Sequence, residues 1–181
     1  MTSPVEIRQL SNRVVYRNRW MTVREDAIER ADGSTGLYGV VEKPGFVVII
    51  AASADGIYLV EQYRYPIGRR FWELPQGSWE ERDVEPAELA RAELREETGL
   101  LAGSIRHVGH LFLAYGFCTQ GYDVYLASEL VQGEAEREPE EQGLIVKAFA
   151  VVDLEAMIRC GEIQDATTVA AFSLARLHGW V

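Results

Sequence analysis

Alternating apolar and polar residues near the start of the chain predict β-strands. Residues 13–17 and 21–30 largely alternate between the two kinds of side chain, as half-buried strands do. Residues 31–36 combine Asp, Gly and Ser and predict a turn, after which residues 37–42 predict a return strand. We therefore expect an antiparallel β-rich subdomain over residues 1–43.

A longer domain is expected after the break at Lys43-Pro44-Gly45, over residues 44–181. The continuous apolar run at residues 46–52 predicts a buried strand at its start. Further strands are expected at 57–63, 107–114, 122–127 and 144–150. Helices are expected at 86–98, 153–159 and 166–178, with Pro86 and Asp165 as start signals and Gly99 and Gly161 as stop signals.

The helix expected over residues 86–98 carries three glutamates on one face. Glu93, Glu96 and Glu97 stand at positions i, i+3 and i+4, which share one side of a helix. The apolar stripe of this helix, roughly a quarter-turn away, is formed by Ala87, Ala90 and Leu94. The carboxylates therefore border the buried side, where crowding costs more than the roughly 0.2–0.5 kcal/mol per like-charged pair of an isolated helix.

Two interpretations of this acidic face are open. A hard divalent cation such as Mg²⁺ binds carboxylate, carbonyl and water oxygens, often together with substrate phosphates, and would stabilise the cluster. Alternatively, the segment is a solvated surface helix on which Arg91 and Arg95 offset the acids.

The net charge of −10 over 181 residues narrows the class of partner. It opposes binding to nucleic acid, which depends on basic surfaces. A small anionic substrate is compatible with this charge if a metal and local arginines bind it. Arg64, Arg69 and Arg70 lie within a short stretch and suit phosphate oxygens, although pairing with surface glutamates is the other interpretation.

The remaining features indicate neither a membrane protein nor a secreted one. The apolar run at 46–52 is too short to cross a bilayer, and the N-terminal residues lack the pattern of a signal peptide. Cys118 and Cys160 have no metal or redox spacing, so we expect reduced thiols and a cytoplasmic protein. His107 and His110 are three apart on an expected strand, so we expect them to point to opposite faces and not to share a metal.

Gly77 and the run Glu93-Leu94-Arg95-Glu96-Glu97-Thr98-Gly99-Leu100 resemble the Nudix box, the signature of Nudix hydrolases. The resemblance implies a Nudix-type α/β/α sandwich around a mixed β-sheet, in the α/β (α+β) class. It implies that metal-dependent hydrolysis cleaves a nucleoside diphosphate linked to another group. It also implies that Glu93, Glu96 and Glu97 bind Mg²⁺, or Mn²⁺ in its place. The chain departs from the signature at Ala92, where the family has arginine, and in a loop after Gly77 that is one residue longer.

Residues 62–65 and 68–77 resemble the ADP-ribose pyrophosphatase branch of that family. This resemblance implies that Arg64 and Glu73 contact substrate and that Gln76 offers its backbone carbonyl to the metal. Arg69 and Arg70 are further candidates for substrate binding, because arginine suits phosphate oxygens.

The acidic segment 133–143 contains the candidates for the group that activates water. By the same resemblance Glu141 is the best match, and Glu140 is the alternate. Glu96 or Glu97 of the helix is a further candidate for accepting the proton. Members of this branch are commonly homodimers that exchange their N-terminal strands, so we expect a homodimer here.

The most specific expectation is hydrolysis of ADP-ribose to AMP and ribose 5-phosphate. Gln120 stands where this branch often has an acid, so another nucleoside diphosphate sugar, such as GDP-mannose, is an alternative substrate. Ala92 favours a second alternative, a sensor that binds a nucleotide without cleaving it.

Overall fold

The computed structural model describes residues 5–78, 84–135 and 143–181. The chain divides into two compact units, which we describe separately. One contains the N-terminal residues up to Gly45 together with Phe112–Gly121. The other contains Phe46–Leu111 and Tyr122–Val181.

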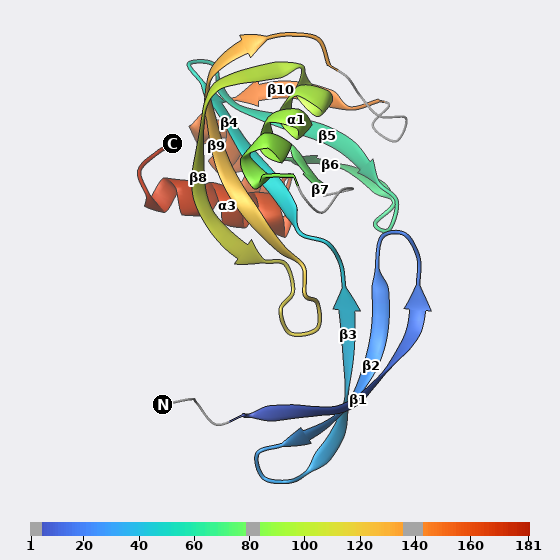
Figure 1. The fold of residues 1–181 in the computed structure, drawn as a ribbon. Coiled ribbons are helices and arrows are strands. Elements are labelled where there is room, and N and C mark those ends of the chain that lie inside the picture. The colour runs from blue at the N-terminus through green and yellow to red at the C-terminus, as the bar shows by residue number, and fades with distance from the viewer. Residues whose placement is uncertain (1–4, 79–83, 136–142) are drawn as a thin grey trace. The chain divides into compact units, whose positions relative to one another are not determined.

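The N-terminal unit is built on a three-stranded antiparallel sheet in the order β1-β2-β3. Its strands are β1 (Ile7–Arg17), β2 (Thr22–Arg30) and β3 (Thr35–Glu42), drawn in blue shades in Figure 1. The turn between β2 and β3 is closed by a hydrogen bond from Ser34 N to Asp32 Oδ1 at 2.9 Å. Strand β1 begins earlier than residues 13–17 predict. All eleven of its residues are exposed, so no burial pattern marks its first half in the sequence.

The segment Phe112–Gly121 is joined to β3 by backbone hydrogen bonds. Val41 N donates to Phe117 O at 2.8 Å, and Thr119 N donates to Val41 O at 2.9 Å. The buried side chain of Gln120 donates from Nε2 to Pro44 O at 2.9 Å. Gln120 therefore has a structural contact within this unit.

The second unit is built on a seven-stranded mixed sheet in the order β10-β5-β4-β9-β8, with β6 paired to β5 and β7 paired to β4. The strands are β4 (Phe46–Ser53), β5 (Gly56–Arg64), β6 (Arg69–Glu73), β7 (Gln76–Ser78), β8 (Leu100–Phe112), β9 (Gly121–Gln132) and β10 (Ile145–Phe149). The helices are α1 (Pro86–Thr98), α2 (Val151–Cys160) and α3 (Ala166–Leu177). Strands β4 and β9 are parallel, which makes the sheet mixed.

Strand β4 separates two apolar cores because its successive side chains point to opposite faces. Val47 and Ile49 pack in the core that contains Ala90 and Leu94 of α1. The alternate residues of β4 pack with α2 and α3 in the core that contains Val48, Ile50, Leu154, Ala171 and Phe172. Figure 1 shows α1 and α3 on opposite faces of the sheet. The expected α/β/α sandwich around a mixed sheet is confirmed.

The helix boundaries follow the signals in the sequence. Helix α1 spans the residues predicted for it, and Gly99 ends it in the left-handed conformation with φ 76°. Asp165 caps α3, as predicted, by accepting hydrogen bonds from the backbone N–H groups of Thr167 and Thr168. Within the described residues, none of the helices combines the length and the apolar character that a membrane span requires.

Strands β6 and β7 are absent from the expected elements, and β8 starts at Leu100 instead of residue 107. Pro75 separates β6 from β7 and has no N–H, so the two strands are short and their pattern is interrupted. Pro75 O still accepts a hydrogen bond from Ile49 N of β4 at 2.8 Å. Leu100 is buried in the α1-side core directly after the helix ends, so β8 begins at once.

Candidate active site

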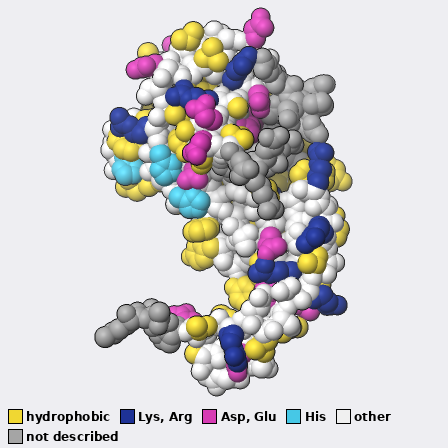
Figure 2. All heavy atoms as spheres, viewed as in Figure 1, with side chains coloured by type: hydrophobic (Ala, Val, Ile, Leu, Met, Phe, Trp, Pro, Cys, Tyr) yellow, Lys and Arg dark blue, Asp and Glu magenta, His cyan; other side chains and the backbone are white. Residues whose placement is uncertain are grey.

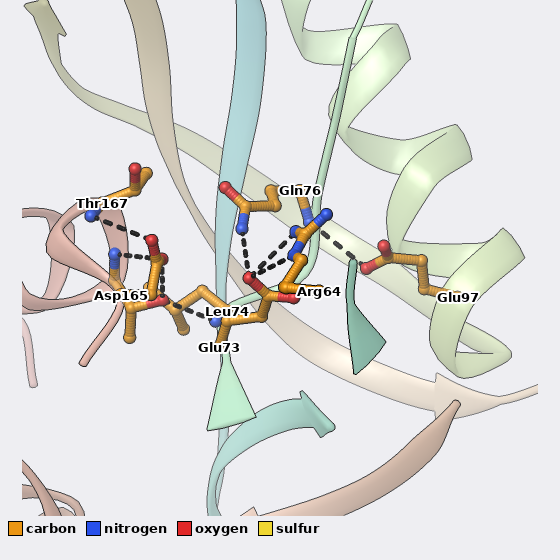
Figure 3. A network of polar contacts seen from close by, with 8 residues as sticks. Arg64, Glu73, Leu74, Gln76, Glu97, Asp165 and Thr167 are labelled. Carbon is orange, nitrogen blue, oxygen red and sulfur yellow. Dashed lines mark hydrogen bonds and ion pairs between the residues drawn. The ribbon is translucent and has the colours of Figure 1, made fainter. Parts of the chain in front are cut away.

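The acidic face of α1 is turned toward strand β7 of the sheet. Glu97 is 3% exposed, and its Oε2 accepts a hydrogen bond from the backbone N–H of Gln76 at 3.2 Å (Figure 3). Glu93 and Glu96 are half-buried. The prediction that the trio borders the buried side is confirmed, and the alternative of a fully solvated face is wrong for Glu97.

Gly77 leaves the space that the Glu93 carboxylate occupies. A Cβ built on Gly77 would lie 1.9 Å from Cδ of Glu93 and 2.0 Å from its Oε1. Any larger residue at this position would displace the carboxylate. In this fold the glycine of the Nudix box therefore leaves room for the carboxylate of Glu93, the first glutamate of the acidic face.

The donor set at the junction of α1 and β7 fits a hard divalent cation. It combines the carboxylates of Glu93 and Glu97 with the backbone of Gln76, and Mg²⁺ takes such oxygen ligands. Glu96 precedes Glu97 on the same helix and is half-buried. Among the described residues, no three His, Cys, Asp or Glu side chains already form a group that could hold a metal ion. The site therefore contains oxygen atoms that suit such a cation, but the described side chains are not already arranged around a metal position.

Arg64 and Glu73 form a partly buried ion pair at the ends of β5 and β6. Arg64 donates to Glu73 Oε2 from Nε at 3.2 Å and from Nη2 at 2.9 Å, and Gln76 Nε2 donates to the same oxygen at 2.9 Å. Glu73 is 2% exposed, and its Oε1 is buried without a hydrogen-bond partner among the described residues. Burial raises the pKa of Glu73, and the charge and hydrogen bonds of Arg64 act in the opposite direction.

Gln76 joins the acidic helix to this ion pair. Its backbone N–H contacts Glu97 and its side-chain amide contacts Glu73, as Figure 3 shows. The structure therefore brings five of the predicted residues into one region: Arg64, Glu73, Gln76, Glu93 and Glu97.

Arg69 and Arg70 have contacts outside this network. Arg69 Nη2 donates to Gln164 Oε1 at 3.0 Å, and its guanidinium lies 5.0 Å from the ring centroid of Phe71. Arg70 donates from Nε to Glu61 Oε2 at 2.9 Å and from Nη2 to Gly143 O at 2.7 Å. The structure brings neither arginine into contact with Glu73.

The expected water-activating residues Glu141 and Glu140 lie outside the described residues.

The expectation that His107 and His110 point to opposite faces of their strand is wrong. His107 Nε2 and His110 Nδ1 lie 2.9 and 3.2 Å from the same oxygen, Asp123 Oδ1, so the rings do not point to opposite faces. Strict alternation is broken in β8, where Val108 and Leu111, also three residues apart, pack in the same core. Figure 2 shows histidine side chains gathered over this strand.

Sequence reasoning missed Thr168, which connects α3 to the site. Its Oγ1 accepts a hydrogen bond from Leu74 N, next to Glu73, at 2.9 Å. The local signal identified Asp165 as a helix cap but gave no indication that the capped helix reaches β6.

The chain matches two family models in succession. A model described as a nucleoside diphosphate sugar hydrolase N-terminal domain matches residues 7–41. A model described as a NUDIX domain matches residues 41–172.

Curated relatives and a solved structure agree with these matches. The chain is 32% identical to an ADP-ribose pyrophosphatase of Mycobacterium tuberculosis (strain ATCC 25618 / H37Rv), over 89% of this chain and 79% of that protein. It is 27% identical to an ADP-ribose pyrophosphatase of Bacillus subtilis (strain 168), over 96% and 94% of the two chains. It is also 27% identical to a methanol dehydrogenase activator of Bacillus methanolicus, over 96% and 94% of the two chains. A crystal structure of an ADP compounds hydrolase shares its fold, with a TM-score of 0.87 at 20% identity over 100% of both chains. The domain match covers most of the chain, and the protein therefore belongs to the Nudix family of hydrolases.

Proposed function

We propose that this chain hydrolyses ADP-ribose to AMP and ribose 5-phosphate with the help of a divalent metal. The observation that carries the proposal is the double contact of Gln76, which places the acidic residues of α1 next to the Arg64–Glu73 pair. The residues proposed to bind the metal and the diphosphate thus adjoin a buried carboxylate, Glu73, whose Oε1 has no hydrogen-bond partner among the described residues. The names of the two ADP-ribose pyrophosphatase relatives support this choice of substrate.

In this proposal Glu93, Glu96, Glu97 and the backbone carbonyl of Gln76 hold Mg²⁺, for which Mn²⁺ substitutes. A cation bound there would neutralise phosphate oxygens and would lower the pKa of a water molecule. The reaction adds one water across the diphosphate. A bond forms between the water oxygen and one phosphorus, and the bond from that phosphorus to the bridging oxygen breaks, so the bridging oxygen leaves with the other phosphate.

The protein side chains bind the substrate and accept the proton. Arg64 has five N–H groups, of which two donate to Glu73, so the others suit the diphosphate. Glu73 Oε1 accepts a hydrogen bond from a hydroxyl or a base edge of the substrate. Arg69 and Arg70 stand as additional candidates for phosphate binding. The proton of the attacking water passes to Glu141, with Glu140, Glu96 and Glu97 as the alternates.

Two alternatives have specific support. The match to a nucleoside diphosphate sugar hydrolase N-terminal domain favours a wider set of substrates, such as GDP-mannose. Ala92, where the signature has arginine, favours a nucleotide sensor that does not cleave its ligand.

The test is a substrate panel with Mg²⁺, in which release of nucleoside monophosphate is measured for the wild type and for Glu97→Gln. We expect ADP-ribose to be the best substrate and Glu97→Gln to lower kcat by about 10²–10⁴-fold. Glu88→Gln is the matched control, because Glu88 is an exposed acid in the first turn of the same helix. Absence of turnover in the wild type, with nucleotide binding retained, would establish the sensor.

We also propose that the chain consists of an N-terminal subdomain at residues 1–43 and a catalytic domain at residues 44–181, and that two copies assemble through the N-terminal subdomain. Strand β1 supports this proposal, because it is exposed along its whole length. The exposed apolar side chains of the subdomain are Val5, Ile7, Leu10, Val14, Val15, Tyr16, Trp20, Leu37 and Tyr38. An apolar surface of this kind is typical of an interface with another chain.

A cytoplasmic location completes the proposal. Both cysteines, the buried Cys118 and the exposed Cys160, are free thiols, as is usual in a reducing compartment. Fractionation of cells that express the tagged protein tests the location, and recovery outside the cytoplasmic fraction would contradict it.

A further inference from the structure

Helix α3 is fastened to the strand that carries Glu73 by one side chain. Thr168 Oγ1 accepts a hydrogen bond from Leu74 N at 2.9 Å and donates to Asp165 Oδ2 at 2.7 Å. Figure 3 labels the two partner residues, Leu74 and Asp165. The donor and the acceptor residue are 94 positions apart in the sequence. Both Thr168 and Leu74 are fully buried, so no bulk water can replace this hydrogen bond.

This contact is important because Leu74 lies between Glu73 and Pro75 in the turn from β6 to β7. Leu74 follows Glu73 directly and is followed by Pro75, which has no N–H to donate. Pro75 O is held by Ile49 N of β4, and Gln76 N is held by Glu97 of α1. The turn from β6 to β7 is therefore anchored at three successive residues, and Thr168 supplies the anchor next to Glu73.

The hydroxyl of Thr168 is oriented by Asp165. Asp165 Oδ2 accepts from both Oγ1 and N of Thr168, at 2.7 and 2.8 Å. Because the hydroxyl proton is directed at Asp165, a lone pair of Oγ1 is available to the N–H of Leu74. Serine retains this hydroxyl, whereas valine has the same shape as threonine but would leave the buried N–H of Leu74 without an acceptor.

We propose that Thr168 is a positioning residue that fixes the segment Glu73–Gln76, and with it the buried carboxylate of Glu73 and the backbone of Gln76. The effect of Thr168 on turnover rests on the function proposed above. Its effect on the segment does not, because that effect is a property of the fold.

The first test measures amide hydrogen exchange by NMR in Thr168→Val and Thr168→Ser. We expect the amide of Leu74 to exchange about 10-fold faster in Thr168→Val and within about threefold of wild type in Thr168→Ser. The amide of Ala51, on β4, lies opposite Tyr58 of β5 and Ala127 of β9 and not against this segment, so it reports the rest of the sheet and should change by less than about twofold. Unchanged exchange at Leu74, or an equal increase at Ala51, would overturn the proposal.

Two controls separate positioning from general destabilisation. Thr167→Val alters the neighbouring buried threonine and keeps the backbone hydrogen bond from Thr167 N to Asp165. Met157→Ala removes packing from the same core without touching this hydrogen bond. Neither control should accelerate exchange at Leu74 selectively. If Thr168→Val does not fold, Thr168→Ala carries the same expectation with a smaller side chain.

The second test measures hydrolysis of ADP-ribose with Mg²⁺ by the same variants. We expect kcat/KM to fall by about 10–100-fold in Thr168→Val, because displacement of binding groups by ångströms has effects of this size. Thr168→Ser should recover to within about threefold of wild type, and both controls should stay within about threefold. A change of less than about twofold in Thr168→Val would overturn the functional part of the proposal. If the wild type cleaves nothing, the proposed function fails, and the exchange experiment still decides the positioning role.

Discussion

Arg64 contacts only one of the two carboxylate oxygens of Glu73. Both of its hydrogen bonds, from Nε at 3.2 Å and from Nη2 at 2.9 Å, end on Oε2. Oε1 is the one buried side-chain polar atom without a hydrogen-bond partner among the described residues. A buried acceptor without a donor is unfavourable, so a ligand that donates to it gains more than it would at an exposed oxygen.

Removal of Arg64 should destabilise the fold because it leaves the Glu73 carboxylate buried and unpaired. We expect Arg64→Met to lower the free energy of unfolding by about 1–3 kcal/mol, a range that allows for the 41% exposure of the Arg64 side chain. Urea denaturation measures this loss, and adding Glu73→Gln should recover part of it. Arg13→Met, which removes an exposed pair with Glu25, should cost less than about 1 kcal/mol. Equal losses in both single variants would contradict the buried-pair account.

The stability of the protein should depend on pH through Glu73. Burial raises the pKa of Glu73 in the folded chain, so the folded state binds the proton more tightly than the unfolded state. The contribution of Glu73 to the free energy of unfolding is therefore greatest when the pH is below the ordinary pKa of a glutamate. This contribution declines as the pH rises through the raised pKa of the folded chain. Urea denaturation of wild type and Glu73→Gln, in EDTA from about pH 4 to about pH 7, measures the difference. We expect the variant to gain relative to wild type as pH rises, and parallel curves would refute the shift.

Gly77→Ala should separate stability from activity. The new Cβ would overlap the Glu93 carboxylate, which is the mobile end of a long side chain and can move aside. We expect the free energy of unfolding to change by less than about 1 kcal/mol, while kcat falls by about 10-fold or more as Glu93 is displaced. Urea denaturation and a kinetic assay give the two quantities. Gly39→Ala is the control, because a Cβ there meets nothing within 4 Å. Full activity in Gly77→Ala would remove Glu93 from the proposed metal site.

A charge on β1 should dissociate the proposed dimer. Leu10 is 50% exposed, so Leu10→Glu should leave a monomer stable while opposing burial of β1 against another chain. We expect light scattering with size-exclusion chromatography to give the dimer mass for wild type and the monomer mass for this variant. Val131→Glu, at an exposed apolar residue of β9, should remain a dimer. A monomer mass for the wild type would reject the dimer itself.

The elements with strong local signals could be predicted from the sequence. Pro86 and Gly99 bound α1 correctly because a proline suits the first turn and a glycine adopts the left-handed φ that ends the helix. The placement of Glu97 near the core followed from helical spacing alone. The apolar run of β4 likewise identified the central strand.

The features that depend on distant contacts could not be predicted. Strand β7 has three residues and is stabilised by pairing with β4, so its own sequence carries too little pattern. The shared contact of His107 and His110 is with Asp123 of the neighbouring strand β9, and the alternation rule applied to β8 alone does not predict it. The bond between Thr168 and Leu74 joins two segments whose proximity follows from the tertiary fold alone.

The parallel pairing of β4 with β9 has a consequence for biosynthesis. Phe46 of β4 pairs with Tyr122 of β9. Because a tight hairpin cannot join two parallel strands, the two strands lie far apart in the sequence. Strand β4 therefore leaves the ribosome long before β9 does. Closing so long a loop is slow compared with forming a hairpin. A nascent chain that has exposed the whole Nudix box still lacks α3, whose Thr168 accepts the hydrogen bond from Leu74 next to Glu73 in the folded chain.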